Sequence, residues 1–544
     1  MSTLYRGAYG LYIASLVYTA IRINHEVPEP YMDDIFHVKQ AQAYCQGRWS
    51  EWDQAITTPP GLYLIPAGLA HLRKLIPEGL GGGIDPCSVA SLRGFNLLIL
   101  AILPLLYTSL LSSIHSESTT FDISSSADSK PSKLATKSKL SESEALRNSL
   151  KWEGLVIALM PTVSFFGYLY YTDLLSLFTL LLSYRFSLSR LYFLSSLLGG
   201  LSLICRQTNI IWIGFVLATS IIREINLLVR GRLAGVGKGV KKGGSQLYDP
   251  LLGQSRMLDL ILTPYSIVYL TSTHVQTIFT TVLVHYLPLF AGFAFFLYQN
   301  GGSVVLGDKS NHVSTIHLPQ IYYFIAFSAV FTSPHLLAGL LEKGKVKVLV
   351  KSLGFGGDWK RHLTTANVLV FMCWTVKNFT VAHPFLLADN RHYAFYIWRR
   401  ILNPHPLARY LLTPLYLVAG KLVYNSLCQA KKMRLSTFLL YSFSTAVVLI
   451  PTPLIEPRYF LLPYIVLRLH HSPTSSLSSS SPTKFTSRQA RLSLEAVLYI
   501  LVSSASIWVF LNKSFEWKFE VGTDGKGVEG RDERELGKRQ RFMW

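Results

Sequence analysis

The sequence predicts an all-α polytopic membrane protein, and three features lead to that class. Half of the 544 residues are apolar, only 15% are charged, and the mean hydropathy is +0.31. A soluble chain of this length would divide into several domains and carry more surface charge. Here the apolar residues form long runs separated by short polar stretches, a pattern typical of helices that cross a bilayer.

The apolar runs give the expected membrane spans. Several are shorter than the ~20 residues that a helix needs to cross a bilayer directly, so we expect about twelve to fourteen spans. The segment 62–76 contains a proline and two basic residues. We therefore expect it to lie in the membrane interface or to form a re-entrant segment instead of a span. The expected spans are 8–22, 90–113, 152–172, 174–188, 190–205, 207–225, 275–298, 318–341, 365–386, 404–425, 435–453, 457–470 and 492–511.

Lysine and arginine in the loops predict the orientation of these spans. With the N-terminus in the cytosol, the basic stretches 223–242 and 343–361 fall on the cytosolic side. The first loop, 23–61, falls on the other side and carries six acidic residues against one lysine and one arginine. Much of the net charge of +21 therefore reflects topology, and we expect no nucleic-acid partner.

Loop composition completes the domain organisation. We treat 1–544 as one transmembrane domain, with 23–89 as its first lumenal loop and 512–544 as a lumenal tail. Segments rich in small and polar residues predict disordered cytosolic loops. These segments are 114–150, 233–256 and 471–488.

The five cysteines are scattered without the close spacing of a zinc site. They predict no disulfide framework, although a single lumenal pair stays open.

Polar residues collect in the segments that this topology places on the lumenal side. The orientation was derived from lysine and arginine counts and not from these clusters, so their agreement predicts a single lumenal polar site. The clusters are 31–37, 48–61, 206–209, 307–317, 383–393, 451–460 and 539–544.

Adjacent acids in the first cluster are candidates for acid–base chemistry. Asp33 and Asp34 follow the first span, where solvated acids are common, but they lie among aromatic residues with His37 nearby. A carboxylate that faces a partly dry cleft can serve as a general base. Adjacent carboxylates could instead indicate a metal site, but a nucleotide-sugar enzyme usually has separated acids in a soluble domain. The sequence shows no such domain, so we expect no metal.

Three arginines near span ends are candidates for binding phosphate. Arg206, Arg391 and Arg458 could each extend to the interface as ordinary snorkelling residues. Together with His383 and His392 they fit a phosphate better, because guanidinium groups bind phosphate in a bidentate manner. These residues alone leave a transporter and a transferase equally open.

Five stretches resemble one family, in the family's order. They resemble the α-1,2-glucosyltransferases that add the terminal glucose in lipid-linked oligosaccharide assembly. The stretches are YMDDIFHVKQAQAYCQGRWSEWDQAITTPPGLYL (31–64), RQTNIIW (206–212), LLADNRHYAFYIWRR (386–400), EPRYFLLPY (456–464) and RFMW (541–544).

The resemblance implies a fold and a reaction. It implies a GT-C-type helical bundle in the endoplasmic reticulum membrane, with its active site on the lumenal side. The implied enzyme moves glucose from dolichyl phosphate glucose to the diglucosylated, dolichyl-diphosphate-linked oligosaccharide used in N-glycosylation. The third glucose is added in α-1,2 linkage with inversion. We expect dolichyl-linked glycolipids and membrane lipid as partners, with neither a cofactor nor an obligate protein partner.

An inverting transfer needs a base for the acceptor and stabilisation of the leaving phosphate. We assign the base to Asp33, with Asp34 in reserve because the family is expected often to have Glu at that position. The residues expected to bind substrate or phosphate are His37, Arg206, His383, Arg391, His392, Tyr393, Arg458 and Tyr459.

Three alternatives compete with this interpretation. A lipid transporter would be favoured by inverted repeats, and the sequence has no evident internal repeat. A non-enzymatic regulator of a channel would not need the acidic pair. A sibling enzyme that adds glucose in α-1,3 linkage is the closest rival, and only the resemblance of 206–209 and 388–393 argues against it.

Overall fold

The computed structural model confirms an all-α protein. It describes residues 3–74, 85–122, 133–235, 246–309, 313–341, 350, 359–430, 433–471, 482–516 and 538–544. Within those ranges, helices dominate, and the only sheet has two strands, β1 (Ser514–Glu516) and β2 (Arg539–Arg541), which pair antiparallel.

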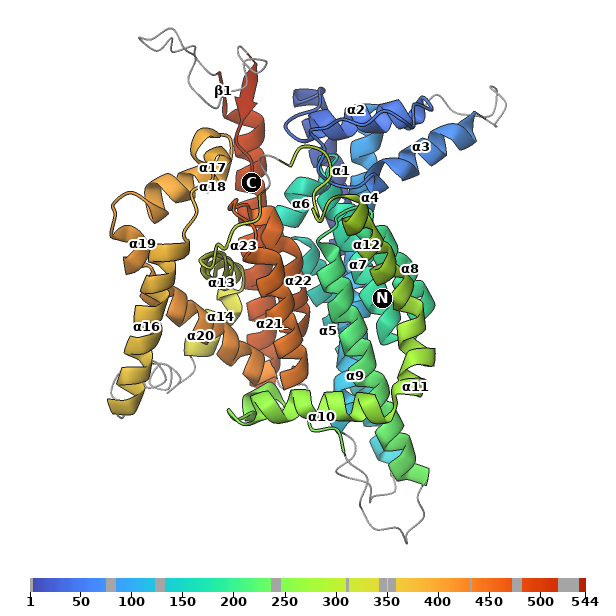
Figure 1. Cartoon of the computed structure of the whole chain (residues 1–544), viewed down its shortest axis with the longest axis vertical. Helices are drawn as coiled ribbons and strands as arrows, with labels where there is room; N and C mark the ends of the chain where they lie inside the picture. The colour runs from blue at the N-terminus through green and yellow to red at the C-terminus, as the bar shows by residue number, and fades with distance from the viewer. Residues whose placement is uncertain are drawn as a thin grey trace.

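Figure 1 labels the helices in chain order. The first group comprises α1 (Thr3–Glu26), α2 (Asp34–Cys45), α3 (Gly61–Arg73), α4 (Val89–Asp122), α5 (Lys133–Ala158), α6 (Pro161–Gly167), α7 (Thr172–Leu188), α8 (Tyr192–Leu203) and α9 (Asn209–Gly235). The second group comprises η2 (Leu252–Gln254), α10 (Asp259–Thr273), α11 (Val275–Ile278), η3 (Phe279–Leu283), α12 (Val284–Gln299), α13 (Gln320–Phe331) and α14 (Ser333–Leu341). The third group comprises α16 (Trp359–Phe379), α17 (Pro384–Ala388), α18 (Tyr393–Ile397), η4 (Trp398–Leu402), α19 (Ala408–Leu411), α20 (Thr413–Ala430), α21 (Leu435–Leu449), η5 (Pro457–Phe460), α22 (Leu461–His470) and α23 (Pro482–Asn512).

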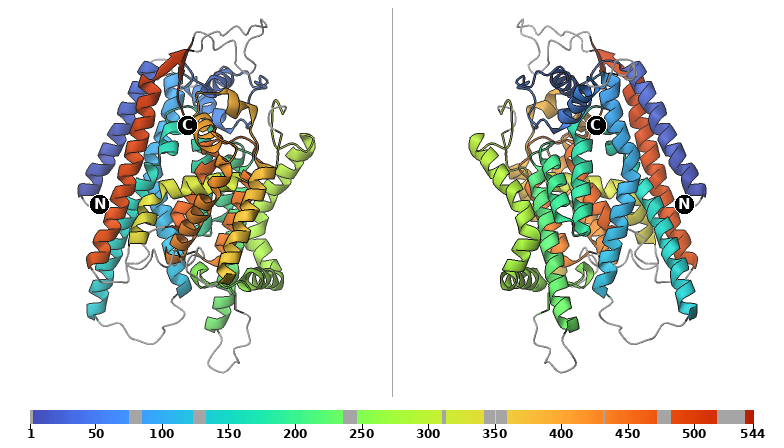
Figure 2. Two further views of the ribbon diagram at one scale, coloured as in Figure 1. Left: turned by 90° about the vertical axis from the view of Figure 1, so that its left-hand side faces the viewer. Right: turned by 90° about the vertical axis from the view of Figure 1, so that its right-hand side faces the viewer.

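The long helices form an elongated bundle with two distinct ends. Helices α2, α3, α17 and α18 gather at one end, called here the pocket end, while α10 lies across the other end (Figure 1). In Figure 2, the first and last helices, α1 and α23, both lie toward one flank of the bundle. The segment expected to be interfacial, 62–76, largely coincides with α3 and lies outside the long helices.

The length and hydropathy of the helices support several membrane crossings. Five helical segments in the described residues are each long and apolar enough to span a bilayer. The remaining expected spans overlap helices that are shorter, bent or more polar, so a count of twelve to fourteen stays a prediction. The five segments are Val89–Glu117, Asn209–Arg230, Val275–Gln299, Ala408–Ala430 and Arg488–Asn512.

Large apolar side chains cover the outside of the long helices. Leu11 of α1, Phe295 of α12, Val370 of α16, Leu415 of α20 and Leu501 of α23 are all exposed. Such side chains would be buried in a soluble protein, whereas lipid is their natural solvent. The chain is therefore a multi-pass membrane protein.

The expected span 152–172 is wrong, because the helix breaks near its middle. Met160 has a non-helical backbone (ψ 122°), and Pro161 starts α6 as a separate helix. Proline favours the first turn of a helix because it lacks the N–H that would otherwise be unpaired there. Between α6 and α7 the helix axis then bends by 117°.

The described parts of the three expected disordered loops have defined structure. Helix α4 continues to Asp122, α5 begins at Lys133, α9 continues to Gly235 and α23 begins at Pro482. Once a helix has nucleated, each further turn forms at little cost, so the apolar helices extend into polar sequence. The parts at 123–132, 236–245 and 472–481 lie outside the described residues, as does 517–537 of the tail.

The 246–256 part of the second loop packs on the bundle, and the helix that follows it was not expected. The carboxylate of Asp249 accepts hydrogen bonds from the backbone N–H and the hydroxyl of Ser436 in α21. Helix α10 has 15 residues and an internal proline, Pro264, so its sequence lacks the length of a span.

A buried charge cluster joins four helices inside the bundle. Arg468 of α22 donates to Glu153 of α5 at 2.8 Å and to both carboxylate oxygens of Glu495 of α23 at 2.8 Å. His335 of α14 contacts the same Glu495 carboxylate at 2.8 Å. All four side chains are buried. If one side chain of the cluster is removed, the charges that it neutralised stay buried without compensation.

We predict that Arg468→Ala destabilises the fold by about 3–5 kcal/mol, because the buried carboxylates of Glu153 and Glu495 lose the arginine that they share. Thermal unfolding in detergent would measure the loss. Arg48→Ala is the matched control, since Arg48 and Glu51 form an exposed ion pair that contributes little to stability. Equal unfolding temperatures for both variants would contradict the structural role of the cluster.

One disulfide braces the pocket end. Cys45, the last residue of α2, is bonded to Cys87, just before α4, while Cys205, Cys373 and Cys428 are free. This is the single pair that the sequence left open. The bond closes the chain around α3, so it holds α2 and α3 against the bundle.

We predict that Cys45→Ser destabilises the protein by about 2–5 kcal/mol, as expected for the loss of a native disulfide. Non-reducing peptide mapping should recover the 45–87 cross-link from wild type. Cys428→Ser is the control and should unfold with the wild type. Free thiols at both 45 and 87 in undenatured, unreduced protein would refute the pairing.

Candidate functional site

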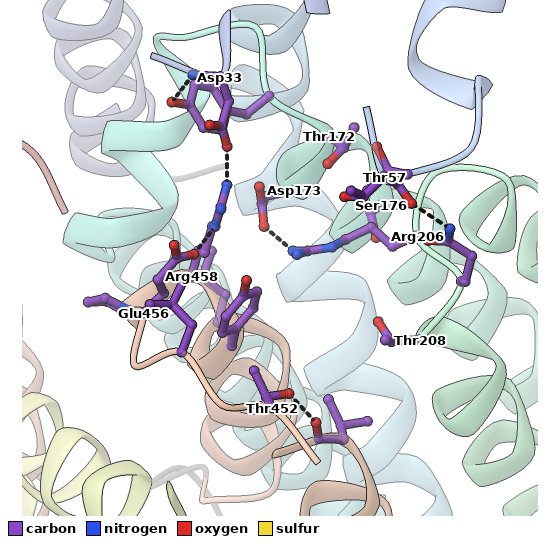
Figure 3. Close-up of a pocket in the computed structure, with 18 of the residues that line it drawn as sticks. Asp33, Thr57, Thr172, Asp173, Ser176, Arg206, Thr208, Thr452, Glu456 and Arg458 are labelled. Carbon is purple, nitrogen blue, oxygen red and sulfur yellow. Dashed lines mark hydrogen bonds and ion pairs between the residues drawn. The ribbon is translucent and has the colours of Figure 1, made fainter. Parts of the chain in front are cut away.

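The pocket end encloses a cavity of about 750 Å³. The chain segments that contribute to its wall are far apart in the sequence, and all of the lumenal polar clusters expected from the sequence reach it. Figure 3 shows several of its polar side chains facing one another. The contributions include Asp33, Thr57, Arg206, Asp308, His392, Arg458 and Trp544. The predicted convergence of these segments is therefore confirmed.

Local backbone geometry turns Asp33 toward the cavity. Met32 has a positive φ of 57°, which is uncommon for a residue with a side chain. This turn precedes α2, and the carbonyl of Asp33 accepts the N–H of His37 at 3.1 Å. The backbone N–H of Asp33 donates to the Tyr171 hydroxyl at 3.2 Å. The carboxylate is left 38% exposed on the cavity wall.

Asp34 points the other way, into the protein. Its side chain is fully buried and accepts two hydrogen bonds from Arg93 of α4, at 2.7 and 3.0 Å. Its second oxygen accepts the backbone N–H of Tyr170 at 2.9 Å. Because Asp34 is bonded to Arg93 and Tyr170 and is not among the residues that line the cavity, it braces the loop instead of facing a substrate.

Arg458 of η5 links Asp33 to Glu456. Its guanidinium donates to Asp33 at 2.5 Å and also bonds to Glu456 (Figure 3). Burial raises the pKa of the Asp33 carboxyl, but the charge and hydrogen bond of Arg458, with contributions from His37 and His392, together lower that pKa below its usual value. Asp33 is therefore ionised at neutral pH.

A second arginine lies on the same wall. Arg206, in the turn between α8 and α9, forms an ion pair with Asp173 at the start of α7. The guanidinium carbons of Arg206 and Arg458 each lie 5.6 Å from the centre of the Tyr459 ring. Tyr459 thus keeps two cations close to one region of the cavity through favourable ring contacts.

His37 lies behind Asp33 on the same face of α2. Its Nδ1 is 2.6 Å from the Tyr63 hydroxyl, and its side chain reaches the cavity wall. Burial lowers the pKa of His37, and the nearby carboxylates only partly oppose that effect. The ring is therefore neutral at pH 7.

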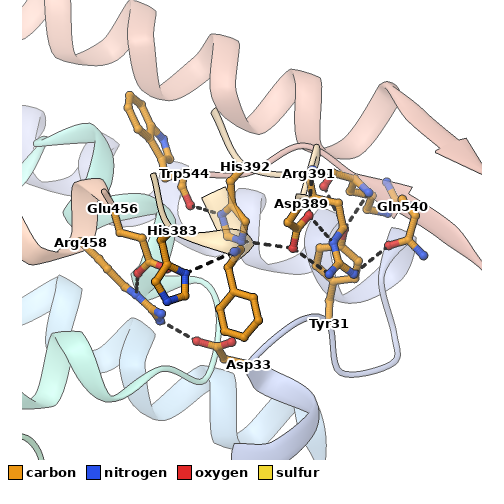
Figure 4. Close-up of polar contacts among 12 residues, drawn as sticks. Tyr31, Asp33, His383, Asp389, Arg391, His392, Glu456, Arg458, Gln540 and Trp544 are labelled. Carbon is orange, nitrogen blue, oxygen red and sulfur yellow. Dashed lines mark hydrogen bonds and ion pairs between the residues drawn. The ribbon is translucent and has the colours of Figure 1, made fainter. Parts of the chain in front are cut away.

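The segment 383–393 divides into residues that face the cavity and residues that brace it (Figure 4). His383 and His392 line the cavity, whereas Arg391 and Tyr393 are not among its lining residues. Arg391 instead donates to both oxygens of Asp389, at 2.8 and 2.9 Å. Arg391 therefore orders the loop that carries His392.

Sequence reasoning missed four cavity residues. Asp389 and Glu456 lie in polar clusters already singled out, but their pairing with Arg391 and Arg458 depends on loop geometry. Asp173 had a signal: it falls between two expected spans, 152–172 and 174–188, where an acid implies a broken span. Trp544 was part of a family-like motif with no assigned role.

Among the described residues, no cluster of three His, Cys, Asp or Glu side chains could hold a metal ion. Four of the acids that line the cavity, Asp33, Asp173, Asp389 and Glu456, are paired with arginines instead. Chemically, the cavity wall offers five carboxyl groups, of which we single out Asp33, together with two guanidinium groups and three histidines. Such a set can remove a proton from a hydroxyl and bind a phosphate beside it.

Comparison with known proteins places these residues in a family. Residues 27–469 match the model of the DIE2/ALG10 family. The chain is 32% identical to a rat protein named Dol-P-Glc:Glc(2)Man(9)GlcNAc(2)-PP-Dol alpha-1,2-glucosyltransferase, over 98% of this chain and 96% of that protein.

Relatives with the same name occur in distant organisms. The Arabidopsis thaliana protein is 32% identical over 96% of this chain and 97% of its own length. The Yarrowia lipolytica protein is 30% identical over 98% and 96%. No solved structure matches the chain, so the GT-C-type architecture stays a prediction. The full-length matches and the cavity built from family-like segments lead to one conclusion: the chain belongs to the DIE2/ALG10 family.

Proposed function

We propose that this protein transfers glucose from dolichyl phosphate glucose to the diglucosylated, dolichyl-diphosphate-linked oligosaccharide, adding the third glucose in α-1,2 linkage. The observation that carries the proposal is the cavity, in which Asp33 and Arg458 are paired on a wall built from family segments. The names of the full-length relatives supply the substrates and the linkage.

The lining of the cavity suits a lipid-linked donor. Beside the charged groups, the wall includes apolar side chains from α9, α12, α21 and α22: Ile210, Ile211, Phe293, Val447, Val448, Leu461 and Leu462. A polyprenyl chain can lie against such a surface while its phosphate meets the arginines. A nucleotide sugar would have no use for this apolar part of the wall.

Asp33 acts as the base. As the 2-hydroxyl oxygen of the acceptor glucose attacks the anomeric carbon of the donor, its proton passes to the Asp33 carboxylate. The bond between the anomeric carbon and the phosphate oxygen breaks, and its electron pair leaves with dolichyl phosphate. Attack opposite the leaving group converts the β-linked donor into an α-linked product.

Cations stabilise the departing phosphate. Its negative charge increases as the bond breaks, so nearby cations favour the transition state over the bound donor. Arg458 and His392 line the cavity and take this role, with Arg206 and His383 further along the wall. Arg391 and Tyr393 contribute by holding the loop of His392. We expect the reaction to need neither a cofactor nor a metal.

We place the protein in the endoplasmic reticulum membrane with the cavity facing the lumen. The basic loops predict this orientation, and the Cys45–Cys87 bond at the pocket end supports it, because disulfides persist on the oxidising side of that membrane. The family assignment favours a transferase over a transporter or a channel regulator, and the relatives are named for α-1,2 and not α-1,3 transfer.

The two adjacent acids should respond differently to the same substitution. Asp33→Asn should lower glucose transfer by about 10²–10⁴-fold while unfolding with the wild type, because it removes the base. Asp34→Asn should lower the unfolding temperature, because it weakens the buried pair with Arg93. Added hexose would be measured by mass spectrometry, with Glu29→Gln, an exposed acid in the same loop, as control.

Full transfer by Asp33→Asn would remove Asp33 as the base. Loss of transfer in a well-folded Asp34→Asn protein would move the catalytic role to Asp34.

The pH dependence should report the pairing of Asp33 with Arg458. The base must be ionised, and Arg458 lowers the pKa of Asp33, so wild-type kcat/KM should fall only well into the acidic range. Arg458→Gln removes that cation and raises the pKa, so the same fall should begin at a higher pH. Residual kcat/KM would be measured between about pH 4 and 8. Arg458→Lys keeps the positive charge, so its kcat/KM should fall at nearly the same acidic pH as in wild type. If kcat/KM falls at the same pH in wild type and Arg458→Gln, the pairing is disproved.

A further inference from the structure

The last residues of the chain return to the cavity. We call residues 539–544 the C-terminal strap. The strap begins as β2, which pairs with β1 just beyond the end of α23, with Phe515 opposite Gln540. It then runs beside the 391–393 loop, and its last two residues, Met543 and Trp544, line the cavity.

The start of the strap is fixed to the bundle by Arg541. The Arg541 guanidinium donates to the carbonyls of Phe510 and Leu511 at 2.8 Å and of Glu26 at 3.0 Å. Its backbone exchanges hydrogen bonds with the Tyr31 hydroxyl, at 2.7 and 2.8 Å. Arg541 thus anchors the strap to the C-terminal ends of both α1 and α23.

The end of the strap holds the loop that carries His392 (Figure 4). The backbone N–H of Met543 donates to the carbonyl of Arg391, and the N–H of Tyr393 donates to the carbonyl of Met543, both at 2.9 Å. The fully buried Gln540 accepts from the Arg391 guanidinium at 3.1 Å. These contacts form a short parallel bridge between Met543 and His392.

One contact determines the hydrogen-bonding state of His392. Its Nδ1 lies 3.0 Å from the backbone carbonyl of Trp544. A carbonyl only accepts, so Nδ1 must carry a hydrogen, and Nε2 is the nitrogen that remains for other partners. Nε2 lies 3.8 Å from the carboxylate of Asp389, another residue that lines the cavity.

We propose that the C-terminal strap is a positioning element for the donor's phosphate group. It holds His392 with Nδ1–H on the strap and Nε2 available to the cavity, so that a protonated ring can donate to a lipid phosphate. Met543 and Gln540 are positioning residues that act through His392 and Arg391, and neither touches the reacting atoms. The inference rests on the proposed function and adds the strap to its phosphate site.

A double-mutant cycle tests the strap. Met543→Pro removes the N–H that bonds to Arg391 while suiting an extended backbone. It should lower kcat/KM for dolichyl phosphate glucose about tenfold in the wild-type background, but less than about twofold in His392→Ala, whose target is already lost. Leu501→Ala is the control, since that exposed side chain of α23 lies outside the strap and does not line the cavity. It should stay within about twofold of wild type in both backgrounds.

A purely structural role would lower activity by the same factor in both backgrounds, and that result would overturn the proposal. If Met543→Pro does not fold, Gln540→Ala in a cycle with Arg391→Ala replaces it, with the same expectation of non-additivity.

A binding assay separates this proposal from the proposed function. Dolichyl phosphate should raise the unfolding temperature of wild type and raise that of Met543→Pro less at the same concentration. If wild type binds dolichyl phosphate but transfers no glucose, the proposed function fails and the strap is still judged by binding. Equal stabilisation of wild type and Met543→Pro, or no stabilisation of wild type, would overturn the strap proposal.

Discussion

The site depends on one buried ion pair, Arg93 with Asp34. Arg93 is almost fully buried, and a buried guanidinium is tolerable only when its donors are satisfied. Besides Asp34, it bonds to the Asn24 side chain and to the carbonyls of Val27 and Glu29. It therefore fixes the whole connection between α1 and α2. Successive residues at a helix start point about 100° apart, so locking Asp34 inward turns Asp33 outward, toward the cavity.

Charge pairing explains how a cavity with several ionised groups can remain stable without substrate. Arg458 is paired with Asp33 and Glu456, and Arg206 with Asp173, so no arginine on this wall lacks an anionic partner in the described structure. In the proposed reaction, the donor phosphate competes with these carboxylates for the same guanidinium groups. A phosphate that draws Arg458 away from Asp33 would also remove the cation that lowers the pKa of Asp33, so donor binding would make the acid a stronger base.

Much of the site could be predicted from the sequence because lysine and arginine counts orient the loops and the polar clusters then fall on one side. Asp33 and Arg458 were identified in this way, although 425 residues separate them. Their pairing could not be predicted, because it depends on how α1, α2 and η5 pack. For the same reason the sequence could not distinguish Asp33 from Asp34 by burial, or show that Arg391 faces Asp389. The break at Pro161 and the crosswise direction of α10 could not be predicted. An apolar run shows that a segment avoids water, but it does not show whether the helix runs along the bundle or across it.

A structure of the purified protein with dolichyl phosphate, determined by electron cryomicroscopy, would test the account most directly. The account predicts phosphate density in contact with Arg458 and His392, with the polyprenyl chain along Phe293 and Val447. Asp33 should line the cavity beside the phosphate, and Asp34 should remain on Arg93. Phosphate bound elsewhere, for example beside α10 at the opposite end, or Asp34 turned into the cavity in place of Asp33, would contradict it.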